Sequence, residues 1–140
     1  MKAFLTAAVG LMFLATIAAQ ESDDAVKKEE GLFKGTWKME TFETEQGKND
    51  DLIGATLKFD AKNMEFIHRD ETKKFTITVN PLGKPKEITF KADDKELPGI
   101  YKLEKDDMTI CVNIEPNQPR PTEFGTKNAC WLITLKRAKE

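Results

Sequence analysis

The feature that most constrains the fold of this chain is an alternation of apolar and polar residues with a period of two. It is clearest where Phe75, Ile77 and Val79 are separated by single threonines. Because successive side chains of a strand point to opposite faces, each such run predicts a strand with one dry and one wet face. About eight strands are expected, at residues 35–45, 55–60, 63–69, 72–80, 86–92, 99–104, 107–114 and 129–137.

The segments between these runs are short and polar, which makes sequential strands antiparallel neighbours. They read "DAKN" (60–63), "NPLGKP" (80–85), "DDKELPG" (93–99) and "EKDD" (104–107). The longest link, 115–128, holds three of the six prolines and is expected to be a loop. The prediction is an all-β fold in which eight antiparallel strands close into an up-and-down barrel, which removes exposed strand edges. A two-sheet β-sandwich is the alternative.

The first residues have the composition of a secretory signal peptide. Lys2 precedes an uncharged apolar stretch from Ala3 to Ala19, which ends in small residues before the chain turns polar. We therefore expect a signal peptide over 1–19, a polar spacer over 20–31 in which a helical turn can form, and one barrel domain over 32–140. A membrane anchor of the same stretch is the alternative. The expected location is the periplasm or the outside of the cell.

The residue inventory argues against catalysis and against several classes of partner. His68 is the one histidine, and Ser22, in the spacer, is the one serine, so a Ser-His-Asp arrangement cannot be assembled in the domain. Carboxylate pairs such as Asp93-Asp94 lie in turns, where aspartate bends the backbone. Acidic and basic residues are interspersed, without the basic stripe that nucleic acid requires. We therefore expect that the protein is not an enzyme, that it binds no metal and no cofactor, and that it does not span a membrane after signal removal.

Two cysteines, Cys111 and Cys130, occur in a chain that is expected to enter an oxidising space. An even number of cysteines there predicts a disulfide. If 111 lies opposite 130 on paired strands, both side chains fall on the outer face. A bridge would close a loop of about 20 residues and stabilise the fold by about 3 kcal/mol. Free thiols are the alternative.

The residues at the start of the first strand resemble those of a known protein family. The chain resembles a lipocalin-type barrel in three features. These are Gly35 and Trp37 at that strand, a meander of about eight strands, and Arg137 on the last strand. The resemblance implies that Trp37 plugs one end of the barrel and that Arg137 lies across its ring. Gly35, lacking a side chain, would let the backbone bend sharply and approach the indole closely.

A second resemblance covers nearly the whole chain after residue 31. The ordered series "GTWKM", "LKFD", "GIYKLEKDDMTICVN", "RPTEF" and "LKR" is similar to a family of exported proteins of planctomycete-type bacteria. That family carries one uncharacterised domain of this length. The resemblance implies an exported β-domain and no particular reaction.

Six residues are candidates for contact with a ligand. His68 shares the inward parity of Met64 and Phe66, although a structural, hydrogen-bonded histidine is the alternative. The loop "RPTEF" places a guanidinium, a hydroxyl, an acid and an aromatic ring within five residues, and loops at a barrel mouth are sites of recognition. Its alternative is a local pair of Arg120 with Glu123, with Phe124 covering the core. The candidates are His68, Tyr101, Arg120, Thr122, Glu123 and Phe124.

Two functions remain open from the sequence. The first is an exported, non-enzymatic domain that binds a small apolar or amphipathic ligand inside the barrel, between residues such as Phe66 and Phe90. The second is a cell-envelope protein-interaction domain with a filled core, whose outer face would present Phe42, Ile67 and Ile100 to a protein partner. The volume of the cavity distinguishes them, since eight-stranded barrels either fill with their own side chains or hold one small ligand.

Overall fold

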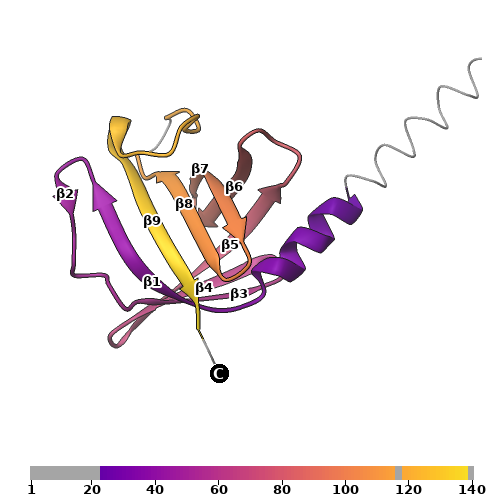
Figure 1. Ribbon diagram of the computed structural model, residues 1–140, viewed down its shortest axis with the longest axis horizontal. Helices are drawn as coiled ribbons and strands as arrows, with labels where there is room; N and C mark the ends of the chain where they lie inside the picture. Colours follow the sequence, from indigo (N-terminus) through magenta and orange to yellow (C-terminus); the bar gives the residue numbers. More distant parts are fainter. Residues whose placement is uncertain (1–22, 116–117, 139–140) are drawn as a thin grey trace, which may run out of the picture.

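All eight predicted strands are present in the computed structural model, which describes residues 23–115 and 118–138 (Figure 1). Every strand pairs antiparallel with its neighbours, in the order β2-β1-β3-β4-β5-β6-β7-β8-β9. The strands are β1 (Gly35–Thr44), β2 (Gly47–Lys48), β3 (Thr56–Asp60), β4 (Asn63–His68), β5 (Glu71–Asn80), β6 (Lys86–Ala92), β7 (Lys95–Glu104), β8 (Asp107–Asn113) and β9 (Cys130–Arg137).

The sheet closes on itself because β1 has a partner on each side. Its first residues pair with β3, from Gly35↔Phe59 to Lys38↔Thr56. Most of its length pairs with β9, from Trp37↔Arg137 to Glu43↔Leu132. The result is a closed antiparallel barrel of eight strands, to which β2 adds a short extra strand, and the sandwich alternative does not form. Closure pairs both edges of the sheet, which removes a surface prone to aggregation.

A bulge in β1 changes which face one aromatic residue occupies. The register of β1 with β9 shifts between Met39 and Thr41, so that Phe42 enters the barrel and is 3% exposed. Strict alternation had placed Phe42 on the outside, so its expected role in an outer patch is wrong. Ile100 is also buried, beneath the segment that contains Phe124. Bulges re-aim side chains in this way because one strand contributes an extra residue.

Besides the β1–β2 hairpin, four hairpins of the barrel turn in two residues, which keeps neighbouring strands in a tight meander. Each turn begins with a residue of positive φ, namely Ala61, Arg69, Asp93 and Lys105. The segment 93–99, expected to be a turn throughout, turns only at 93–94, and β7 already starts at Lys95. Pro98 is tolerated within β7 because the pairing with β8 begins one residue later, at Gly99.

A helix over residues 23–33 precedes β1, where the sequence predicted a spacer with at most a helical turn. Figure 1 shows this helix against one end of the barrel. Its inner face presents Val26, Glu29 and Phe33, at helical spacing, and Phe33 is completely buried. The Phe33 ring packs between Phe59 and Tyr101, with centroids 5.3 and 5.0 Å away. The expected signal peptide, 1–19, lies outside the described residues.

The helix fills the end of the barrel at which β1 begins. Around it the interior is packed with fully buried side chains, including Trp37, Met108 and Leu135. Within the described ranges, no helix combines the length and the apolar character needed to cross a bilayer.

Candidate ligand-binding cavity

The plug expected from the first strand is present at the helix-covered end. Trp37 is 0% exposed, and its indole N–H donates to the carbonyl of Phe33 at 2.9 Å. The guanidinium of Arg137 lies 4.3 Å from the Trp37 ring centroid, which is a cation–π contact. Gly35 has a φ of +128°, and a Cβ there would lie 3.2 Å from Arg137 Nη1. Glycine therefore suits position 35 for two reasons. It adopts this positive φ without strain, and it leaves space for the guanidinium of Arg137.

Arg137 also holds the end of the helix. Its Nη2 donates to the carbonyl of Leu32 at 2.8 Å, and its Nη1 donates to the carbonyl of Lys34 at 3.0 Å. These carbonyls lie in and just beyond the last turn of the helix, where backbone acceptors lack helical partners and a cation is favourable. Asp106 adds an ion pair to Arg137 Nε at 3.3 Å. One side chain thus joins β9, the helix and the plug.

A buried carboxylate fixes the same helix to the barrel wall. Glu29 is 5% exposed, and its Oε2 accepts hydrogen bonds from the Tyr101 hydroxyl at 2.5 Å and from Lys86 Nζ at 2.9 Å. Burial, reinforced by the hydrogen bond to Glu29 and by its charge, raises the pKa of Tyr101 far above its ordinary value. Tyr101 is therefore occupied in holding the helix, and it lies at the plugged end rather than in an open site.

The opposite half of the barrel contains a cavity of about 310 Å³. All eight barrel strands contribute to its walls, together with Leu52 and Ile114 from the segments beside them, and three of its seventeen lining residues are polar. Among its apolar residues are Phe42, Phe66, Phe75, Phe90, Leu97 and Trp131. Phe42 and Trp131 meet edge to face with centroids 4.8 Å apart, and Phe75 and Phe90 do so at 6.2 Å. The barrel is therefore filled in one half and hollow in the other.

All three polar residues of the cavity belong to the β4–β5 hairpin. They are His68, Glu71 and Lys73. In the strand register His68 lies opposite Glu71, while Lys73 lies opposite Phe66. His68 is thus the one sequence candidate for ligand contact that the structure places in the cavity. Glu71 and Lys73 were missed, although they share the inward parity of Phe75 and Ile77 on the same strand.

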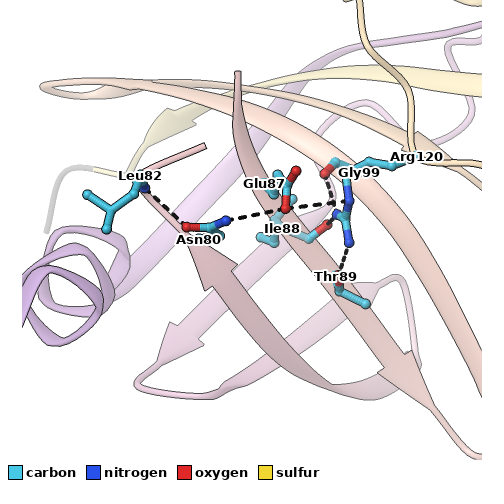
Figure 2. Close-up of polar contacts among 7 residues, drawn as sticks. All are labelled: Asn80, Leu82, Glu87, Ile88, Thr89, Gly99 and Arg120. Atoms are coloured by element: carbon cyan, nitrogen blue, oxygen red, sulfur yellow. Dashed lines mark hydrogen bonds and ion pairs between the residues drawn. The ribbon is translucent and has the colours of Figure 1, made fainter. Parts of the chain in front are cut away.

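Arg120, one of the candidates in the "RPTEF" loop, lies beside Ile88, Thr89 and Gly99 (Figure 2), and it is on the outer face of the barrel because it bonds the outward side chain of Thr89. Its Nη1 donates to the carbonyls of Ile88 and Gly99 at 2.9 and 2.8 Å, and its Nη2 donates to Thr89 Oγ1 at 2.8 Å. Its Nε is 3.8 Å from Glu87 Oε1. The guanidinium joins β6 to the incoming loop, so it acts as a structural anchor, with Glu87 and not Glu123 as its acidic neighbour.

The rest of that loop also packs against the outside. Phe124 joins a cluster with Ile100, Cys111, Cys130 and Leu132, and Lys102 Nζ lies 5.2 Å from its ring centroid. Thr122 and Glu123 are exposed. Phe124 therefore covers a small outer cluster and not the barrel core, and none of these residues lines the apolar cavity.

Both cysteines are buried free thiols beneath this loop. Cys111 pairs with Leu132, and Cys130 pairs with Asn113, so the expected pairing of 111 with 130 is wrong by two residues. The Cys111 thiol donates instead to the carbonyl of Gly125 at 3.2 Å. Burial, followed by the nearby Cys111, raises the pKa of Cys130 to about 11. The predicted disulfide is not formed in this structure.

A larger hollow of about 640 Å³ lies on the outer surface between the β6–β7 hairpin and the residues Ile114, Gln118 and Arg120. Its walls are mostly polar side chains of both charge signs, such as Lys91, Asp94 and Glu96. The guanidinium of Arg120, at its edge, already donates to three protein oxygens. Small-molecule sites combine concave apolar walls with a few polar groups, and the barrel cavity meets that description whereas the outer hollow does not.

Within residues 23–115 and 118–138, no group of three or more histidine, cysteine, aspartate or glutamate side chains is arranged to hold a metal ion. Comparison of the chain with models of protein families, with curated proteins and with solved structures found no match in any of the three.

Proposed function

We propose that this protein is an exported, non-enzymatic binding protein that holds one small apolar or amphipathic molecule in its barrel. The observation that carries the proposal is the apolar cavity of about 310 Å³ in the half of the barrel away from the helix. Transfer of an apolar ligand from water to such walls is favourable by about 25 cal/mol for each Å² of apolar surface buried.

The cavity favours this function over a protein-interaction domain with a filled core. A filled core would continue the packing of Trp37 and Met108 through the whole barrel, and it does not. The outer patch that such a domain would present loses Phe42 and Ile100, since both are buried. The remaining half-buried Ile67 is a single apolar residue of the kind that ordinary surfaces carry.

The volume sets the size of the ligand. Sites for small molecules range from about 300 to 1,000 Å³, so this cavity is at the lower end. An apolar cavity of about 150 Å³ holds one benzene molecule, which makes a two-ring compound or a medium-length alkyl chain a suitable occupant here. Large polycyclic ligands are too big without movement of the walls.

Export is part of the proposal because of the composition of residues 1–19. A charged start, an apolar stretch and a small-residue end are the three parts of a secretory signal. The absence of catalysis rests on the residue inventory, since the cavity contains no serine or cysteine nucleophile beside His68. A carrier or sensor of an apolar compound outside the cytoplasm fits both arguments.

The test is titration of the protein with N-phenyl-1-naphthylamine, a neutral dye whose fluorescence rises in apolar sites. The proposal predicts saturable binding of one dye per chain, accompanied by a change in the fluorescence of Trp131, which lines the cavity. Trp131→Phe should remove the protein signal, whereas Trp37→Phe should keep it because Trp37 lies in the plug. Absence of saturable binding would contradict the proposal.

A matched pair of variants locates the dye. Val112→Trp adds a large side chain inside the cavity, and it should abolish dye binding while the protein remains folded. Thr109→Trp makes the same addition on the same strand but on the opposite face, and it should leave binding unchanged. Equal effects of both variants would place the dye elsewhere. Thermal unfolding of each variant verifies that the fold is intact.

A further inference from the structure

The polar residues of the cavity are confined to one place, and this has a consequence for the ligand. All three, His68, Glu71 and Lys73, lie on the β4–β5 hairpin, while the remaining lining residues are apolar. A ligand with polar groups at both ends, or spread around its perimeter, would leave some of them against apolar walls. Unpaired polar groups in such surroundings are costly. The arrangement favours a molecule with an apolar body and one polar head directed to this hairpin.

The register of the hairpin separates the three residues into a pair and a single cation. His68 and Glu71 are directly opposite each other across β4 and β5, so their side chains are close neighbours. Lys73 is opposite Phe66, a ring of the cavity wall, and has no acid as its cross-strand partner. Among residues 23–115 and 118–138, none of the ion pairs involves Lys73.

We infer that the ligand is an amphipathic monoanion, with a carboxylate or a similar head group that pairs with Lys73 at the rim. The inference rests on the proposed function and deepens it by naming the charge of the ligand. The apolar body occupies the cavity between Phe66, Phe75 and Phe90, and the head group stays near solvent because Lys73 itself is exposed. The long stem of a lysine covers apolar surface while its ammonium remains hydrated, which suits this position.

The expected selectivity is modest because the ion pair is exposed. Pairs of this kind contribute about 0.2–1 kcal/mol, which corresponds to a preference of up to about fivefold for an anionic over a neutral head group. The preference should shrink as salt is added, since the charges are screened over about 10 Å at 0.1 M ionic strength. The apolar part of the affinity should not weaken with salt.

The experiment displaces N-phenyl-1-naphthylamine with decanoate, decanol and decylamine, which share one alkyl chain and differ in head group. Decanoate should displace the dye at severalfold lower concentration than decanol, and decylamine should be the weakest. Lys73→Met should bring decanoate to the level of decanol without changing decanol itself. Lys74→Met removes the same charge from the outer face of the same strand, and it should preserve the preference.

Two results would overturn the inference and leave the proposed function standing. One is displacement at equal concentrations by decanoate and decanol. The other is a preference for decylamine that Glu71→Gln abolishes, which would make the ligand a cation paired with Glu71. The proposed function itself fails if the neutral dye shows no saturable binding, whatever the head-group preference. The two failures are therefore distinguishable in one set of titrations.

Discussion

Replacement of Arg137 by methionine should destabilise the fold by about 2–3 kcal/mol. Methionine keeps much of the length of the side chain but removes the guanidinium, with its hydrogen bonds to the carbonyls of Leu32 and Lys34 and its contact with Trp37. Two hydrogen bonds from a charged group to part-exposed carbonyls contribute about 1 kcal/mol each, because water can replace the donor. The cation–π contact adds about 0.5–1 kcal/mol.

The ion pair with Asp106 adds little to that sum. The Asp106 side chain is 72% exposed, and exposed pairs contribute about 0–1 kcal/mol. Asp106→Asn should therefore cost less than about 0.5 kcal/mol, whereas Arg137→Lys, which keeps the charge but loses the planar fork, should cost about 1–2 kcal/mol.

Urea unfolding followed by tryptophan fluorescence measures these differences as shifts of the midpoint at constant slope. The reasoning would be refuted if Arg137→Met cost less than about 1 kcal/mol. It would also be refuted if Asp106→Asn were as destabilising as Arg137→Met, because the ion pair, and not the hydrogen bonds from the guanidinium, would then hold the helix. A loss of protection in residues 23–33, measured by hydrogen exchange, should accompany Arg137→Met and not Asp106→Asn.

Three further predictions concern other parts of the molecule. The raised pKa of Tyr101 means that near pH 10 the unfolded chain loses the phenolic proton while the folded protein keeps it, so the free energy of unfolding should fall above pH 10. Tyr101→Phe should remove about 1.4 kcal/mol per pH unit of that decline, measured by urea unfolding across pH. Cys111 and Cys130 should react slowly with a thiol reagent at neutral pH and yield two free thiols after unfolding, whereas a mass lower by two hydrogens before reduction would contradict this. Lys105→Gly should raise the free energy of unfolding by about 0.5–1 kcal/mol, because glycine adopts the positive φ of this turn without strain, and an unchanged midpoint would argue against that strain.

The barrel could be predicted from the sequence because strand alternation is a local property. The inward set Phe75, Ile77 and Val79 is visible in the chain and occupies the interior in the structure. The alternation fails at Phe42, where a bulge between Met39 and Thr41 changes the face. A bulge depends on the partner strand, which no local pattern contains.

The sequence predicted only a helical turn where the helix over 23–33 forms, because the face that packs on the barrel is not apolar throughout. Only Val26 and Phe33 are apolar there, and the third inward residue is the acidic Glu29. A carboxylate on a buried face is explained only by its partners, Tyr101 and Lys86, which are distant in sequence. The long-range contacts that stabilise the helix are therefore absent from the local signal.

The candidate site was predicted only in part. Parity placed His68 correctly at the cavity, and the same parity would have found Lys73. The position of the "RPTEF" loop could not be predicted, because a loop after β8 can fold over the mouth or back along the outer wall. The hydrogen bonds from Arg120 to the carbonyls of Ile88 and Gly99 hold the loop along the outer wall. The same limit applies to the pairing of Cys130 with Asn113, which depends on register.

The most direct test of the central claim is native mass spectrometry of the protein isolated gently from its own cells. A protein that carries a small amphipathic molecule in the barrel should show one discrete extra mass per chain, lost on denaturation and absent from Val112→Trp. The released compound should be an anion small enough for a cavity of about 310 Å³. A clean mass of the bare chain in repeated preparations, unchanged after incubation with decanoate and decanol, would contradict the account.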